Sequence, residues 1–404
     1  FIFGELGLDG RVKSTPTIFP IILSLATQIS YLKVLVPLEI LEAIQHIPGI
    51  EAWGIQTLQE ALLFFKEHRY TTPYVTNAKA PVFGESLTIE GKDYFYHSNF
   101  PLDFKDVKGQ IRAKRALLIA AAGMHNILLE GSPGCGKSMS IKRLRFILPP
   151  QSIEEILSSY AYTSLHEPES SFNAVRPFRS PHHTSSRPSI FGGGSAQSKA
   201  GEVALAHNGI LFFDEFPNFS KTILESLREP LEDHRVLISR VNSKISYETK
   251  FLFAAAQNPC PCGNLLSTTK ECRCSDLEIS RYKSRISEPI LDRIDLYIQM
   301  NEEQNKEESL SSKAMFEQVI QAFIMQKNRG QYELNGKMDE QSTEHFCTLS
   351  DEANETLTLA QNRLGLSARS LHKVKRIART IADLSSSTLI SKEHLLEALS
   401  FRKR

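Results

Sequence analysis

The chain has 404 residues, of which 41% are hydrophobic and 23% are charged, and its 47 basic and 46 acidic side chains leave a net charge of +1. This composition is typical of a globular protein with about two to four domains, and it excludes an intrinsically disordered chain. A balanced charge gives no general affinity for nucleic acid, so a nucleic-acid role requires local clusters of basic residues.

The sequence contains no segment that we expect to span or anchor in a membrane. The longest uncharged candidate, residues 14–32, is interrupted by Pro16 and Pro20. The chain starts Phe1-Ile2-Phe3, without a Met or a basic segment, so we expect no signal peptide and interpret this start as the boundary of an incomplete chain. The cysteine spacing does not resemble a secreted disulfide framework. We therefore expect a cytoplasmic protein.

The first 101 residues are predicted to form a small domain and a linker. Within residues 1–66, Leu32–Pro37 is predicted as a strand, followed by an amphipathic helical stretch over 38–47. The segment 67–101 is polar and has the proline content of a linker, with Pro73, Pro81 and Pro101.

The remainder is predicted as an α/β domain over residues 102–300 and a connector with a helical domain over 301–404. Short, mostly continuous apolar runs in the first of these are typical of central strands in a parallel sheet that is covered on both faces: Ile127–Glu130, Ile210–Phe213 and Phe251–Ala254. In the second, helix starts are predicted at Ser350 and Ser391.

The octapeptide Gly131-Ser132-Pro133-Gly134-Cys135-Gly136-Lys137-Ser138 matches G-x-x-x-x-G-K-[ST], the phosphate-binding loop of many nucleotide hydrolases. It follows an apolar run and precedes a helical pattern over 139–146, which is the context that the motif requires. The backbone N–H groups of such a loop face the phosphates at a helix N-terminus. Lys137 is expected to reach the β- and γ-phosphates and Ser138 to hold Mg²⁺. The sequence therefore predicts ATP and Mg²⁺ as cofactors.

Polar residues follow two of the predicted strands at the edge where open parallel sheets bind ligands. Asp214 is expected to belong to the Mg²⁺ shell and Glu215 to polarise the attacking water. Asn258, which follows the strand over 251–256, is placed to orient that water, although an Asn in such a position is also a common turn former.

Four cysteines form the pattern C-x-C-x₉-C-x-C: Cys260, Cys262, Cys272 and Cys274. Four thiolates at this spacing can close a tetrahedral Zn²⁺ site, and such a metal would brace the loop that carries Asn258. Free thiols and a regulatory disulfide are the alternatives.

Taken in order, these motifs resemble those of an AAA+ ATPase. Further segments resemble the ComM/YifB family of bacterial magnesium-chelatase-like AAA+ proteins, over essentially the whole chain. The segments that carry this resemblance are Asp106–Gln110, Arg176–Thr184, Phe191–Gly194, Asn258–Gly263, Leu291–Asp295, Leu366–Arg369 and Ala378–Leu384.

The resemblance implies a P-loop AAA+ core with a parallel sheet, a C-terminal helical lid, and a partial Lon-protease-like α+β domain over residues 1–66. That domain is expected to be non-proteolytic, because Phe19 or Ile21 stands where the catalytic lysine is expected. The resemblance also implies a homo-oligomeric ring, expected to be a hexamer, with ATP between neighbouring subunits.

The same resemblance implies roles for two arginines. Arg293 stands at the position of an arginine finger, and Arg369 at that of the sensor-2 arginine, a cofactor-binding role. The alternatives are an ion pair of Arg293 with Asp292 or Asp295, and a solvated helix-surface charge for Arg369.

Residues 235–250 are predicted as a β-hairpin with its turn at 241–244. Related ATPases point such a hairpin into the central pore, where Arg240 and Lys244 would contact DNA phosphates without base specificity. A solvated hairpin is equally compatible with the sequence. The neighbouring His182 and His183 are interpreted as structural or pore-lining residues.

The function implied by the resemblance is that of a ring-forming ATPase that translocates on single-stranded or branched DNA. In this family the activity drives branch migration in homologous recombination during natural transformation. The alternative is a motor of the magnesium-chelatase type that remodels a partner protein for Mg²⁺ insertion into a porphyrin. A nucleotide-binding scaffold without motor activity is a third possibility.

Overall fold

The computed structural model describes residues 1–67, 74–76, 83–166, 172–193, 199–239, 244–301 and 310–403. Contacts divide the chain into two units, of which the first contains residues 1–86 and 152–174 and the second contains residues 87–151 and 175–404. The domain boundaries expected from the sequence stay predictions.

The first unit is built around a three-stranded sheet with the order β3-β4-β5. Strand β3 (Leu32–Pro37) is parallel to β4 (Ile50–Ile55), which is antiparallel to β5 (Tyr74–Thr76). The other elements of this unit are β1 (Glu5–Leu6), β2 (Val12–Lys13), α1 (Ile18–Ala26), η1 (Leu38–Ile40), α2 (Leu41–Ile44), α3 (Leu58–Glu67) and α6 (Ile153–Ser164).

Helix α6 belongs to the first unit, although residues 87–151, which belong to the second unit, lie between it and the rest of the first unit in the sequence. It packs against α1, and the ring of Phe19 meets that of Tyr160 edge-on at 4.7 Å. Phe19 is 1% exposed. Of the two positions considered for a catalytic lysine, Phe19 is therefore a core aromatic residue, whereas Ile21 is 45% exposed. The absence of proteolytic activity stays a prediction.

Two segments differ from their sequence-based expectations. The stretch 38–47 forms the short 3₁₀ helix η1 and a single turn of α-helix, α2, rather than one amphipathic helix. The segment expected as a linker contains the hairpin β6 (Glu85–Ile89) and β7 (Lys92–Tyr96), which forms a sheet with β9 (Gln151–Ser152). Its prolines lie outside these strands, so they do not interrupt the ladder.

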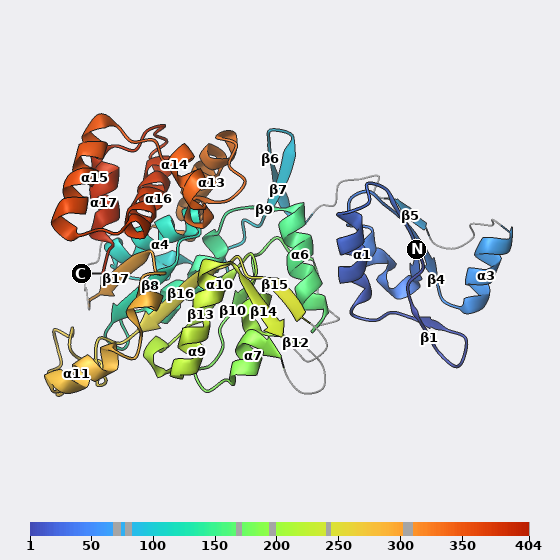
Figure 1. Cartoon of the computed structure of the whole chain (residues 1–404), viewed down its shortest axis with the longest axis horizontal. Coiled ribbons are helices and arrows are strands. Elements are labelled where there is room, and N and C mark those ends of the chain that lie inside the picture. Colours follow the sequence, from blue (N-terminus) through green and yellow to red (C-terminus); the bar gives the residue numbers. More distant parts are fainter. Residues whose placement is uncertain are drawn as a thin grey trace. The chain divides into compact units, whose positions relative to one another are not determined.

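Five parallel strands form the central sheet of the second unit, which can be followed in Figure 1. In chain order they are β8 (Ile127–Gly131), β10 (Phe178–Arg179), β13 (Ile210–Phe213), β16 (Leu252–Gln257) and β17 (Leu296–Met300). Their order across the sheet is β10-β13-β16-β8-β17. Every residue of β8, β13 and β16 is buried, which is why their sequences lack the polar–apolar alternation of half-exposed strands.

Helices and short hairpins surround this sheet. The helices before residue 300 are η2 (Phe104–Asp106), α4 (Ile111–Gly123), α5 (Lys137–Leu144), η3 (Arg145–Ile147), α7 (Arg187–Phe191), α8 (Glu202–Leu205), η4 (Phe216–Asn218), α9 (Lys221–Ser226), α10 (Arg228–Glu232), α11 (Asp276–Lys283) and α12 (Glu288–Leu291). The antiparallel pairs are β11 (Gly192–Gly193) with β12 (Lys199–Ala200), and β14 (Arg235–Ser239) with β15 (Lys244–Glu248).

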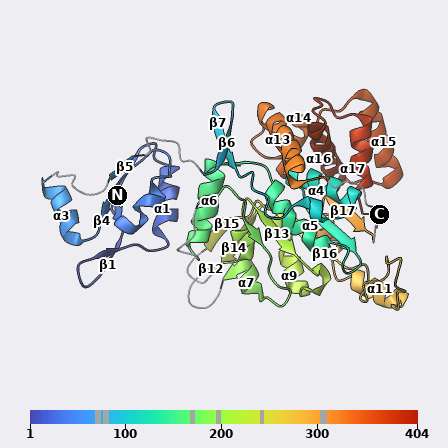
Figure 2. The ribbon, with the colours of Figure 1, turned by 180° about the vertical axis from the view of Figure 1, so that it is seen from behind.

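The C-terminal region is helical, and both views show its helices grouped beside α4 (Figures 1 and 2). These elements are α13 (Ser312–Asn328), η5 (Asn335–Lys337), α14 (Glu340–Phe346), α15 (Asp351–Leu364), α16 (Ala368–Leu384) and α17 (Lys392–Ser400). Ser350 and Ser391 are the N-caps of α15 and α17, as predicted. The α/β fold with a parallel-sheet core and a helical C-terminal region is therefore confirmed.

None of the helices in the described ranges combines the length and the apolar character that crossing a bilayer requires.

Candidate nucleotide site

The loop 131–138 connects β8 to α5 at the carboxyl edge of the parallel sheet. Gly134 and Gly136 have φ angles of +84° and +92°, a left-handed conformation that residues with a Cβ rarely adopt. These two glycines let the backbone turn sharply before α5 starts at Lys137. The loop therefore has the strand–turn–helix geometry that presents backbone N–H groups to an anion.

The ammonium group of Lys137 lies over this loop. Its Nζ donates to the carbonyl oxygens of Gly131 at 2.5 Å and Ser132 at 2.9 Å, and to Oδ1 of Asn258 at 3.2 Å. Cys135 Sγ lies 3.8 Å from the same nitrogen. Burial lowers the pKa of Lys137, while the neighbouring Cys135 and Asp214 oppose that shift. The structure thus brings together the predicted residues Lys137 and Asn258, which are 121 positions apart.

The two residues predicted to hold Mg²⁺ are also in contact. Ser138 Oγ donates to Asp214 Oδ2 over 2.7 Å. Ser138 is in the first turn of α5, and Asp214 follows β13, so the contact depends on the parallel packing of β13, β16 and β8. A hydroxyl and a carboxylate facing one another beside a phosphate loop are the protein ligands that a Mg²⁺–nucleotide complex uses.

Glu215 follows Asp214 and points its carboxylate into solvent, with 54% of the side chain exposed. Its φ of +51° is unusual for a residue with a side chain, and backbone strain of this kind clusters at functional sites. Asn218 Nδ2 donates to Glu215 Oε2 at 3.0 Å, and His183 Nδ1 lies 3.5 Å from that oxygen. A carboxylate that is held on two sides and open to solvent is suited to polarise a water molecule.

The position of His183 could not be derived from the sequence. The histidine follows β10, and β10 pairs with β13 in parallel, so the residues after both strands reach the same edge of the sheet. Only the order of the strands places His183 beside Glu215. The sequence signal for a functional role of His183 is that it lies within the segment Arg176–Thr184, which carries the family resemblance.

The two predicted arginines meet at a carboxylate that the sequence analysis did not identify. Arg293 forms an ion pair with Glu232 Oε2, and Arg369 Nη2 lies 2.7 Å from Glu232 Oε1. The alternative in which Arg293 pairs with Asp292 or Asp295 is therefore wrong, since its carboxylate partner is the last residue of α10. Arg293 is nearly buried, with 7% of its side chain exposed, whereas Arg369 is 48% exposed.

Glu232, Arg293 and Arg369 line a cavity of about 400 Å³ in the second unit. Burial lowers the pKa of Arg293, and the adjacent charges of Arg369 and Arg228 act in the same direction. Glu232 compensates this repulsion, because it accepts from both guanidinium groups. The guanidinium groups of the two arginines donate to Glu232 and to the Pro289 carbonyl. None of these three hydrogen bonds reaches loop 131–138 of the same chain.

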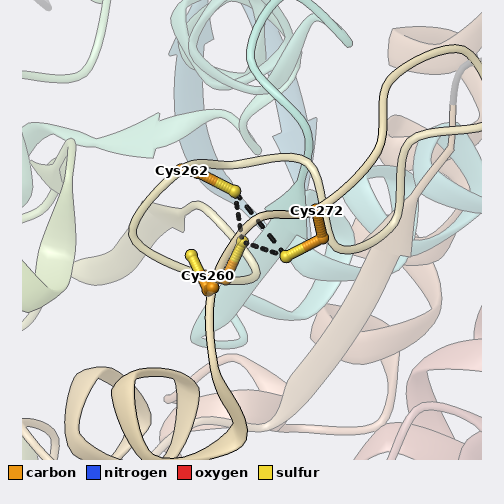
Figure 3. Close-up of side chains that lie close together, drawn as sticks. Cys260, Cys262 and Cys272 are labelled. Atoms are coloured by element: carbon orange, nitrogen blue, oxygen red, sulfur yellow. Dashed lines mark hydrogen bonds between the residues drawn. The ribbon is translucent and has the colours of Figure 1, made fainter.

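The four clustered cysteines converge in space (Figure 3). The Sγ atoms of Cys260, Cys262 and Cys272 are separated by 3.4, 3.6 and 3.7 Å, and all four Sγ atoms, with that of Cys274, lie within 4.8 Å of one another. These separations exceed the ~2.05 Å of a disulfide, and all six cysteines of the chain are free thiols. Tetrahedral zinc with Zn–S bonds of ~2.3 Å spaces its sulfurs about 3.8 Å apart, so this set fits the metal.

The predicted DNA-binding hairpin is present as β14 and β15, and its register pairs Ser239 with Lys244. Arg240 lies outside the described residues, as does the side chain of Lys244. Their contact with DNA stays a prediction.

The chain is similar to two described protein families and to several individual proteins. The family described as "Magnesium chelatase, subunit ChlI" matches residues 103–308, and "Magnesium chelatase, subunit ChlI C-terminal" matches residues 309–402. The chain is 36% identical to "Competence protein ComM" of Haemophilus influenzae, over 98% of this chain and 76% of that protein. It is 40% identical to "Uncharacterized protein YifB" of Escherichia coli, over 74% of this chain and 60% of that protein. An uncharacterized protein of Mycobacterium tuberculosis is 31% identical over 100% of this chain and 78% of its own length.

Proposed function

Because the chain belongs to the ComM/YifB family of magnesium-chelatase-like AAA+ proteins, we propose that it hydrolyses ATP and uses the energy to move along DNA. One observation carries the first part of this proposal. The phosphate loop with Lys137, the pair Ser138–Asp214, and Asn258 are in mutual contact at one edge of the sheet, and Glu215 follows Asp214 directly. This is the set of groups that phosphoryl transfer requires.

In the proposed mechanism each residue acts through the contact that it makes. The loop 131–138 binds the phosphates through its backbone N–H groups, and Lys137 contacts the β- and γ-phosphates. Ser138 and Asp214 would hold Mg²⁺, which would supply positive charge beside the phosphate oxygens. Glu215 accepts a proton from the attacking water, and Asn258 orients that water. Asn218 and His183 position the Glu215 carboxylate, as their contacts with its Oε2 suggest.

We further propose that Arg293 and Arg369 complete the site of a neighbouring subunit. Their shared partner is Glu232 rather than the phosphate loop of their own chain, which fits a role in trans. An arginine that reaches the γ-phosphate of a neighbour stabilises the charge of the transition state. This arrangement requires a closed homo-oligomeric ring, for which six subunits is the number that the family resemblance implies.

The DNA part of the proposal is supported by the relative from Haemophilus influenzae, whose name assigns it to competence. A motor that drives branch migration during recombination of incoming DNA fits that assignment. The hairpin β14–β15 would contact the DNA backbone through Arg240 and Lys244, without base specificity. A cytoplasmic location is part of the same proposal.

A second candidate function follows from the family descriptions themselves, which name magnesium chelatase subunits. In that case the same ATPase would remodel a protein partner during insertion of Mg²⁺ into a porphyrin. Stimulation of ATP turnover separates the two candidates, because only a DNA motor is expected to respond to forked DNA.

The direct experiment replaces Glu215 by Gln and measures ATP turnover and unwinding of forked DNA. Loss of the proton acceptor is expected to reduce ATP turnover by at least about 100-fold and to abolish unwinding, while ATP affinity stays within about twofold. The matched control is Glu352→Gln, which changes an exposed carboxylate in the first turn of α15. Unchanged ATP turnover in Glu215→Gln would refute the mechanism. ATP turnover of the wild-type chain that does not change when forked DNA is added would refute the DNA motor.

A further inference from the structure

We propose that Cys260, Cys262, Cys272 and Cys274 bind one Zn²⁺, and that this ion holds the cysteine loop against the phosphate loop, so that metal occupancy sets the nucleotide affinity of the same subunit. The cysteine loop is defined here as residues 260–274. The proposal rests on the proposed nucleotide site and adds a metal site that controls it.

The ligand set favours zinc over other divalent ions. All four candidate donors are thiolate sulfurs, and a soft S₄ set of this size selects zinc or an iron–sulfur centre over Mg²⁺, Ca²⁺ or Mn²⁺. The sulfur separations of 3.4–3.7 Å are close to the edge of a Zn–S₄ tetrahedron. Each two-cysteine arm supplies two ligands, so one ion closes the loop between them.

Contacts between sulfurs already cross-connect the two arms. Cys272 Sγ of the second arm lies 3.7 Å from Cys260 Sγ and 3.6 Å from Cys262 Sγ of the first arm. The arms are therefore arranged as a ligand cage rather than as four independent thiols.

The first arm packs directly on the phosphate loop. Gly263 has a φ of +81°, and a Cβ built on it would lie 2.6 Å from Cδ and 2.7 Å from Cγ of Pro133. The N–H of Gly263 donates to the carbonyl of Cys260 at 3.0 Å, which closes the turn that carries both ligands of this arm. Only a glycine fits this close approach, so the turn and the Pro133 ring are in immediate contact.

A second contact joins the same arm to the nucleotide lysine. Asn258 precedes Cys260 by two residues and accepts from Lys137 at 3.2 Å. Cys260 itself is 0% exposed, so the backbone between Asn258 and Gly263 is anchored at its centre. The metal would thus be fixed between two contacts with loop 131–138, one through Asn258 and one through Gly263. Loss of the metal releases both contacts, because four unbound thiols no longer hold the arms together.

The first experiment measures metal in the full-length chain. Zinc content by mass spectrometry is expected to be one ion per chain, and to fall to a background level in the double variant Cys262→Ser/Cys272→Ser. The control is Cys347→Ala, which removes a buried thiol outside the cluster and is expected to keep one zinc per chain. Absence of zinc after reconstitution of the wild type, or equal zinc in the double variant, would overturn the site.

The second experiment measures binding of a fluorescent ADP in excess Mg²⁺, before and after removal of zinc by a zinc-selective chelator. Removal is expected to weaken binding about tenfold, equivalent to about 1.4 kcal/mol, and zinc addition is expected to restore it. Circular dichroism recorded in parallel verifies that the stripped chain stays folded. Unchanged affinity in folded, stripped protein would overturn the coupling.

The variant Gly263→Ala tests the contact while keeping the metal. Its methyl group would crowd the rigid Pro133 ring, so zinc content is expected to stay at one per chain while nucleotide affinity falls several-fold. Gly330→Ala is the matched control, because Gly330 has a similar φ of +76° but nothing within 4 Å of the added Cβ. Equal affinities in the two variants would contradict the contact. A zinc-loaded wild type that binds no nucleotide at all would instead refute the proposed function and leave the metal site standing.

Discussion

The stability of this fold depends on pH through the buried side chain of His234. Burial and the neighbouring charges of Lys337, Lys250 and Arg376 lower the pKa of His234 to about 3, and Asp295 opposes them only in part. The ordinary value is ~6.5, so this imidazole stays neutral in the folded chain under mildly acidic conditions. In the unfolded chain it takes up a proton below ~6.5.

The buried, neutral His234 makes the folded chain less stable as the solution is acidified. Above ~6.5 both states are neutral and His234 contributes nothing, whereas below it the unfolded state binds the extra proton and gains about 1.4 kcal/mol per pH unit. His234→Asn removes this proton site and suits the φ of +52°, since Asn tolerates the left-handed region. Urea unfolding of the two chains at pH 7.5 and pH 5 is expected to show a loss of stability on acidification that is about 1–2 kcal/mol smaller in the variant. Identical losses would mean that His234 titrates normally in the folded protein.

At the scale of the element, helix α16 is joined to the turn before α17 by a buried arginine. Arg379 is 0% exposed and donates to Asp383 one turn later at 3.2 Å. Its Nη atoms also donate to the carbonyl oxygens of Ser387 and Thr388. A charged side chain therefore holds the loop after α16 against that helix, because it bonds to a carboxylate on the helix and to two carbonyls of the loop.

Replacement of Arg379 by Met is expected to lower the free energy of unfolding by about 3 kcal/mol, because it breaks a fully buried ion pair with Asp383 and removes the donors of two loop carbonyls. Arg363→Met, on the exposed surface of α15, is the control and is expected to stay within about 0.5 kcal/mol. Urea unfolding followed by the helical circular dichroism signal measures both. Similar values for the two variants would show that Arg379 contributes no more than a surface arginine.

At the scale of the whole molecule, the proposed ring makes each active site depend on two chains. In this proposal the loop 131–138 and Glu215 come from one subunit, and Arg293 comes from the next. A chain with Arg293→Ala and a chain with Glu215→Gln are then each inactive, for different reasons. An arginine finger accounts for roughly 10³–10⁵ in rate, so either defect alone is severe.

Mixing the two inactive chains is expected to restore ATP turnover. About a quarter of the interfaces in a random equimolar ring combine an intact Glu215 with an intact Arg293 from the neighbour, and turnover per chain is expected to rise accordingly. Each variant mixed with itself is the control. A mixture no more active than the sum of its parts would contradict sharing of the site between subunits.

Much of this molecule could be predicted from local sequence. The strands at 127–131, 210–213 and 252–257, the hairpin at 235–248, the helix starts after Ser350 and Ser391, and the fold class all follow from patterns that lie within short windows. The residues Lys137, Ser138, Asp214 and Asn258 could also be proposed as neighbours, because the carboxyl ends of parallel strands share one edge of a sheet. The hairpin within residues 67–101 was harder to predict from the sequence. The prolines on either side of it are typical of a linker and not of a sheet.

The fold class and the residues that follow each strand could be derived from local patterns, because propensity, capping and hydrophobic patterning act between near neighbours. The contacts between distant residues could be known only from the folded chain: His183 with Glu215, both arginines with Glu232, and Gly263 with Pro133. The folded chain also shows that α6 belongs to the first unit. These contacts depend on strand order and on the packing of loops that follow different strands, and the same local patterns are compatible with several such arrangements.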